Sequence, residues 1–158
     1  MHALVFEVSH EQDDLGHDLP EYFVPSIADW YQELGKEHHT GAVECLKTAM
    51  NQLLEINTET GEIKAIFTED ALKRYFESDF ETFQKELGLL QSITLEQFAG
   101  INPNRIETSL YRLKDAYEGS TTYIYLSDDG EIITLESFLR RLKPGEQLYL
   151  GTVWDYHI

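Results

Sequence analysis

The chain has 158 residues, of which 42% are hydrophobic and 12% aromatic, a composition typical of globular proteins rather than disordered ones. Twenty-nine acidic residues outnumber twelve basic ones, so the formal net charge is -17. A field of that sign repels nucleic acid and anionic membranes and attracts cationic surfaces. At this length we expect one domain, residues 1–158, built around one hydrophobic core.

Three features of the sequence point to a cytoplasmic location. The first residues include no basic segment and their apolar run is broken at Glu7, so no signal peptide is expected. No stretch approaches the ~20 apolar residues of a membrane span. The single cysteine, Cys45, can form no internal disulfide, which is typical of a reducing compartment.

Acidic charge is concentrated at the N-terminus. Residues 1–35 contain no Lys or Arg and therefore hold -8 of the net charge, from Glu7, Glu11, Asp13, Asp14, Asp18, Glu21, Asp29 and Glu33. Uncompensated charge of one sign destabilises a folded chain through self-repulsion. This segment is therefore a candidate for functional selection.

In chain order, alternating residues 3–8 predict a strand, and residues 9–21 predict a polar loop. A short helix is expected from Ser26, a suitable N-cap, to Gly35, because apolar side chains recur at helical spacing: Ile27, Trp30, Tyr31 and Leu34.

Residues 36–40 are expected to be a polar link, followed by a second helix that ends before the turn residues 57–62. Its apolar positions are Val43, Leu46, Met50, Leu53 and Leu54. Residues 63–67 are predicted to form a short strand.

Thr68 is expected to cap the longest helix. One apolar stripe on it faces the core or a partner helix: Leu72, Phe76, Phe80, Phe83, Leu87 and Leu90. This periodicity places the acidic side chains on the outer face: Glu77, Asp79, Glu81 and Glu86.

Thr94 to Gln97 has the pattern of a capping box, and Gly100 is expected to end that short helix. Another helix is expected to begin at Asn102-Pro103, with Ile106, Leu110, Leu113 and Tyr117 on its apolar side.

The last forty residues predict a hairpin of strands Thr121–Leu126 and Glu131–Ile133, a helix over residues 135–142, and a long strand Gln147–Tyr156. The expected fold class is α+β. It is a single domain whose small, mostly antiparallel sheet combines the N-terminal strand, the C-terminal hairpin and the terminal strand. About five to six helices pack on that sheet.

Catalytic motifs are absent from the sequence: there is no nucleophile elbow, cysteine-protease signature or glycine-rich phosphate loop. We therefore expect no enzyme, no catalytic residues and no cofactor. One alternative is a small metal-dependent enzyme that uses the 9–18 loop, which contains His10, Asp13, Asp14, His17 and Asp18. A solvated acidic loop is the preferred interpretation, because this spacing matches no metal site, and no metal is expected.

A second alternative is a winged-helix DNA-binding protein, since two short helices precede a hairpin. Its second helix would offer Arg105, Arg112 and Lys114, but acidic residues accompany them and the hairpin tip is Asp128-Asp129. Those carboxylates would face DNA phosphates with the wrong sign.

The leading hypothesis is a non-enzymatic intracellular binding protein whose acidic surface blocks a cationic site on a basic partner, such as a nucleic-acid-binding protein or a nuclease. Carboxylates would lie where phosphates bind, and exposed aromatic side chains would add contact area. Small acidic inhibitors of this DNA-mimic kind occur among anti-CRISPR, antirestriction and nuclease-toxin immunity proteins, a likeness of composition only. The candidate partner-binding residues are Glu11, Asp13, Asp14, Asp18, Glu21, Tyr22, Trp30, Glu77, Asp79 and Glu81.

Overall fold

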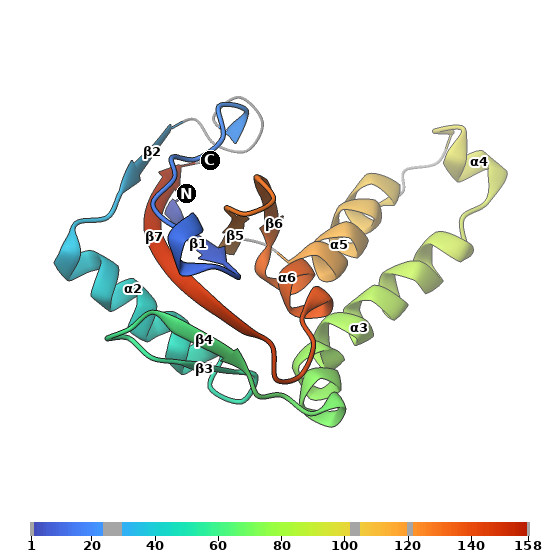
Figure 1. Ribbon diagram of the computed structural model, residues 1–158. Helices are drawn as coiled ribbons and strands as arrows, with labels where there is room; N and C mark the ends of the chain where they lie inside the picture. The colour runs from blue at the N-terminus through green and yellow to red at the C-terminus, as the bar shows by residue number, and fades with distance from the viewer. Residues whose placement is uncertain (1, 24–29, 102–104, 120–121, 158) are drawn as a thin grey trace.

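Strand β7 (Gln147–His157) is the centre of a mixed sheet (Figure 1). The computed structural model describes residues 2–23, 30–101, 105–119 and 122–157. One edge of β7 pairs antiparallel with β1 (His2–Ser9). Its other edge is shared by β4 (Glu62–Ala65) and β2 (Trp30–Glu33), both antiparallel to it.

The remaining strands extend the sheet on both sides. β3 (Leu54–Ile56) pairs with β4, while β5 (Thr122–Leu126) pairs with β1 and forms a hairpin with β6 (Glu131–Thr134). Among the described strands only the β1–β5 pair is parallel. The predicted α+β domain with a mostly antiparallel sheet is therefore confirmed; the predicted start of β5 at Thr121 lies outside the described residues.

A bulge in β7 changes which of its side chains point to each face of the sheet. Phe6 of β1 lies opposite Val153 and Val8 lies opposite Leu150, so Glu7 faces two residues, Gly151 and Thr152. An extra residue of this kind changes the face to which the following side chains point. Leu150 and Val153 consequently share one face of the sheet.

The first face of the sheet packs against α2 (Lys36–Ala49), α6 (Leu135–Arg141) and the beginning of α3 (Glu69–Gln91). The buried side chains of α6 follow the predicted helical spacing, and Thr134 caps that helix by accepting from Ser137 N–H. Burying each large aliphatic or aromatic side chain contributes about 1.5–3 kcal/mol. The centre of this core consists of Phe6, Val8, Leu46, Ile124, Phe138, Leu139, Leu148 and Val153.

The opposite face is covered in part by the loop of residues 10–23. Leu19 and Phe23 of this loop are buried against Val5, Trp154 and Tyr156 of the sheet. The Phe23 and Tyr156 rings meet edge to face with centroids 5.6 Å apart, a favourable aromatic geometry. The polar loop predicted for residues 9–21 thus has an apolar underside.

The helix predicted from Ser26 to Gly35 is wrong over its described part, because Trp30–Glu33 is strand β2. Ser26 and Ile27 lie outside the described residues. The C-terminal half of β7 offers an edge to pair with, and Trp30 stacks on His157 across that pair with ring centroids 5.8 Å apart. Strand pairing and aromatic cross-strand contact override a helical spacing of only four positions.

The second helix was predicted too late in the chain. α2 begins at Lys36, within the expected polar link, and ends at Ala49. Leu53 and Leu54 leave the helix, and Leu54 begins β3 because its backbone pairs with Ala65 in the β3–β4 hairpin. The strand predicted over residues 63–67 is confirmed as β4, with shifted ends.

Residues 69–101 and 105–118 form a helical arm that leads away from the sheet (Figure 1). α3 and α5 (Ile106–Glu118) lie side by side, and α4 (Leu95–Phe98) stands at the far end. The caps at Thr68 and Thr94 are confirmed, the latter as a complete capping box. The predicted start of α5 at Asn102-Pro103 lies outside the described residues.

None of the described helices has the length and apolar character needed to cross a membrane.

Candidate interaction surface

The loop after β1 presents carboxylates to solvent. Glu11, Asp13, Asp18 and Glu21 are exposed and Asp14 is half-buried, with Asp13 and Asp14 in the short 3-10 helix η1 (Gln12–Asp14). None of the five forms an ion pair with another described residue. The structure therefore gathers five of the predicted site residues in one loop, where their charge is uncompensated.

Buried Glu7 fixes this acidic loop to the sheet. Its Oε1 accepts hydrogen bonds from the backbone N–H groups of Gly16 and His17, at 2.9 and 3.0 Å, and its Oε2 accepts one from Thr152 N–H at 2.9 Å. A side chain on Gly151 would overlap the Glu7 carboxyl group, so the bulge requires glycine there. Sequence reasoning placed Glu7 in the strand but gave it no role.

The two predicted aromatic contact residues both retain exposed surface. The Tyr22 hydroxyl donates to the Gly130 carbonyl oxygen at 3.3 Å, which links the acidic loop to the β5–β6 turn. Trp30 is held by its stacking on His157. Each ring therefore contacts a neighbouring element while part of its surface stays open to solvent.

The acidic face predicted for α3 is only partly correct. Glu77 and Glu81 are exposed and Asp79 is half-buried, and none of the three forms an ion pair with described residues. Figure 1 shows that α3 belongs to the arm, whereas the acidic loop lies by the sheet. The predicted site residues thus form two separate groups.

Glu86 was placed on that outer face, and this prediction is wrong because Glu86 is buried. It lies three residues after Phe83 and four before Leu90, so the helical repeat turns it toward α5. Its Oε1 lies 3.5 Å from Arg112 Nη1, while its Oε2 has no hydrogen-bond partner within the described part of the chain.

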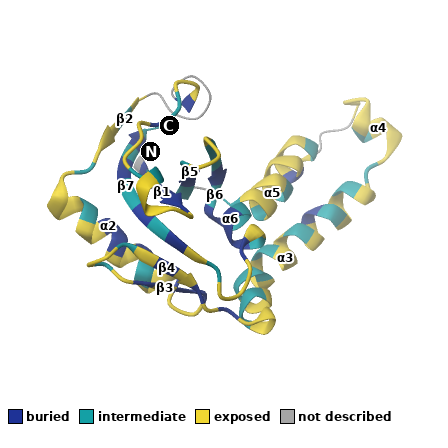
Figure 2. Ribbon diagram, in the orientation of Figure 1, coloured by how far each residue is buried: buried dark blue, intermediate teal, exposed yellow. Residues whose placement is uncertain are grey.

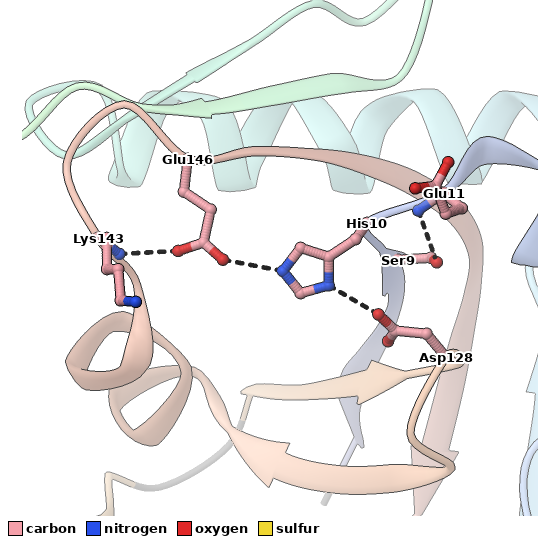
Figure 3. Close-up of polar contacts among 6 residues, drawn as sticks. All are labelled: Ser9, His10, Glu11, Asp128, Lys143 and Glu146. Carbon is pink, nitrogen blue, oxygen red and sulfur yellow. Dashed lines mark hydrogen bonds and ion pairs between the residues drawn. The ribbon is translucent and has the colours of Figure 1, made fainter.

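His10 links three loops at one end of the sheet: its own loop after β1, the β5–β6 turn and the loop before β7 (Figure 3). Its Nδ1 lies 2.7 Å from Asp128 Oδ2 in the β5–β6 turn, and its Nε2 lies 2.8 Å from Glu146 Oε1 just before β7. The hydrogen bonds to Asp128 and then Glu146 raise the pKa of His10. Burial alone would raise the pKa of Glu146, but the Lys143 backbone N–H and His10 outweigh it and lower that pKa.

Metal binding by the 9–18 loop finds no support in this geometry. His10 pairs with carboxylates outside the loop, and His17 contributes its backbone N–H to Glu7. Within the described residues no three His, Cys, Asp or Glu side chains are arranged to hold a metal ion.

We expect His10→Ala to lower stability by up to about 1 kcal/mol, as for an exposed ion pair. The pKa of His10 is raised on folding, so its stabilising contribution is complete below its ordinary value of 6.5 and is lost as pH rises through the folded value. Thermal unfolding near pH 6 should therefore show a larger loss than unfolding near pH 9, where the imidazole has lost charge. His17→Ala, in the same loop, is the control, and an equal loss at both pH values would contradict the assignment.

The cations considered for the winged-helix alternative are partly engaged within the arm. Arg112 faces Glu86, and Lys114 Nζ lies 3.7 Å from Glu118 Oε2. α4 is a single turn and α5 packs along α3.

Sequence reasoning missed the exposed apolar side chains of the arm. Among the described residues from 77 to 118, only Glu86 and Ser109 are buried, so the two helices have no enclosed core of their own (Figure 2). At the far end Leu95, Phe98 and Ile101 are 82%, 76% and 71% exposed. Apolar side chains this exposed mark an interaction site where they form one patch.

Comparison of the chain with protein family models, with curated proteins and with solved structures finds no match. Its function is therefore inferred from its own charge and geometry.

Proposed function

We propose that this chain is a non-enzymatic binding protein whose acidic surface occupies a cationic, nucleic-acid-binding site on a basic protein partner. One observation carries the proposal: every predicted acidic site residue lacks an ion-pair partner in the described part of a chain of net charge -17. Repulsion among these unpaired carboxylates costs folding stability, and a cationic partner would relieve that repulsion.

The anchoring of the acidic loop suits this role. Glu7 holds the loop backbone, and buried Leu19 and Phe23 hold its underside, so the outward carboxylates are presented with little freedom. A preorganised surface loses less conformational entropy on binding. Tyr22 and Trp30 would supply the short-range contact area that charge alone does not give.

The carboxylates would act where a partner binds phosphates, and long-range attraction would speed the encounter. Small acidic inhibitors of this kind occur among anti-CRISPR and antirestriction proteins and among immunity proteins against nuclease toxins. The charge and geometry of the acidic loop support membership of this functional class.

We expect the on-rate for a partner captured from the native cell to fall steeply as salt rises. The screening length shrinks from about 30 Å at 0.01 M to about 8 Å at 0.15 M ionic strength. Asp13→Lys with Asp14→Lys should lower the on-rate about tenfold or more at low salt. Glu55→Lys with Glu59→Lys makes the same charge change on an exposed hairpin and serves as the matched control.

The competition itself is tested with nucleic acid. Duplex DNA or RNA that the captured protein binds should displace this chain, and excess chain should displace the nucleic acid. Salt-independent binding, or simultaneous binding of the chain and the nucleic acid, would refute the proposal.

A further inference from the structure

One face of the helical arm carries apolar side chains on both helices, and several of them are exposed among the described residues. The apolar residues recur at i, i+3 and i+7 on each helix, so they form one row on α3 and one on α5. Phe83 and Tyr117 bring the rows together, with ring centroids 6.4 Å apart. We call this face the arm groove; it consists of Phe80, Phe83, Leu87, Leu110, Leu113 and Tyr117.

The arm groove deepens into a cavity at its base. The cavity has a volume of about 360 Å³ and is lined by Phe76, Phe80, Phe83 and Tyr117, with Arg140 of α6 closing it. This volume is at the lower end of the ~300–1,000 Å³ range of ligand pockets. The Arg140 guanidinium lies between the Phe76 and Tyr117 rings, 4.5 and 4.3 Å from their centroids, so the base is held in place by cation–π contacts.

Large apolar side chains along the groove remain in water. Phe80, Tyr117 and Leu110 are 58%, 56% and 51% exposed, although burial of such side chains is favourable by roughly 1.5–3 kcal/mol each. Phe80 and Tyr117 line the cavity, and Leu110 lies further along the α5 row. Exposed apolar groups beside a preformed cavity have the form of the anchor sites found at protein interfaces.

Carboxylates border the groove. Glu77 precedes Phe80 by three residues and Glu107 precedes Leu110 by three, so each adjoins the apolar row of its helix; Asp79 lines the cavity. None of these three forms an ion pair with described residues. An occupant with cationic edges would complement this border, whereas a second copy would bring identical carboxylates and another charge of -17.

We propose that the arm groove binds an amphipathic helix of a partner protein, one with an apolar face and Lys or Arg residues along its edges. From Phe76 in the basal cavity to Leu87 at the other end of the groove is eleven residues, about 16 Å at 1.5 Å per residue, which accommodates about three turns of a docked helix. The inference rests on the proposed function in taking the partner to be basic, but it concerns a surface distinct from the acidic loop.

The test uses a fluorescein-labelled synthetic peptide of about five helical turns, with leucines on one face and lysines on both edges, in anisotropy titrations with the full chain. We expect saturable binding that weakens about tenfold or more for Phe80→Ala with Leu110→Ala. Tyr111→Ala is the control, because this exposed residue follows Leu110 and points off the groove face. Glu77→Lys with Glu107→Lys should weaken binding at low salt, and less so at high salt.

Two further measurements separate this inference from the proposed function. A peptide of the same composition in scrambled order should bind at least ~10-fold more weakly; equal binding would overturn the groove inference, since charge alone would then explain it. Loss of binding in Asp13→Lys with Asp14→Lys, or in Leu95→Ala with Phe98→Ala, but not in the groove variants, would also overturn it. The acidic-loop proposal would survive those outcomes and fails only in its own salt and competition test. Circular dichroism of each variant confirms that the arm is folded.

Discussion

Glu7→Ala is expected to destabilise the chain by about 2–3 kcal/mol, because three backbone N–H groups lose a carboxylate acceptor, at about 1.5–3 kcal/mol for a hydrogen bond to a charged group, and the two in the exposed loop can bond water instead. Those groups belong to Gly16, His17 and Thr152, so the acidic loop should detach from β7. Denaturant unfolding measures the loss of stability. Hydrogen exchange should show faster exchange at Gly16 and His17, the loop amides that Glu7 holds.

Two substitutions separate the hydrogen bonds of Glu7 from its charge. Glu7→Gln keeps the shape but turns one acceptor oxygen into a donor, so at least one bond is lost and an intermediate destabilisation is expected. Glu11→Ala removes an exposed acid nearby and should stay within about ±0.5 kcal/mol. If Glu7→Ala behaved like Glu11→Ala, the loop would be held by Leu19 and Phe23 alone.

Local patterns in the sequence predicted the elements that depend on neighbouring residues. The caps at Thr68 and Thr94, the β5–β6 hairpin and the spacing of α6 all involve contacts within a few residues. Such local preferences can be read directly from a sequence. The α+β class followed from them.

Features that depend on distant residues were missed. Glu7 receives the Thr152 N–H from 145 residues away, and His10 meets Asp128 and Glu146 across 118 and 136 residues. Trp30 became part of a strand because an edge of β7 was open to it. No local pattern encodes these partners. Glu86 was missed for a different reason: a local pattern was available, because the helical repeat through Phe83 and Leu90 already places it on the inner side of α3.

The candidate site was predicted only in part, because one of its surfaces follows from composition and the other depends on how distant helices pack. Composition identified the acidic loop, because charge needs no folding partner to be counted. The arm groove requires knowledge that α3 and α5 lie side by side and that apolar side chains on one face of the pair stay exposed among the described residues. The apolar stripe on α3 was correctly expected to face the core or a partner helix, yet Phe80 is left exposed.

Gly119→Ala is expected to have the second large effect, because this glycine ends α5, the last helix of the arm. Its φ of 73° and ψ of 175° lie in a region that is nearly restricted to glycine and costs other residues about 1–3 kcal/mol. A Cβ atom there would also overlap the half-buried Glu136 carboxyl group of α6. We therefore expect at least about 2 kcal/mol of destabilisation in chemical unfolding.

Glu136→Ala in the Gly119→Ala background separates the two causes, since it removes the overlap but leaves the strained backbone. Stability should recover only in part. Gly88→Ala is the matched control: a Cβ at this position of α3 meets no atom within 4 Å, and alanine in a helix interior is about 0.5–1 kcal/mol more favourable than glycine. We expect Gly88→Ala to raise stability and Gly119→Ala to lower it. If Gly119→Ala left stability unchanged, the end of α5 would have to adjust without displacing α6.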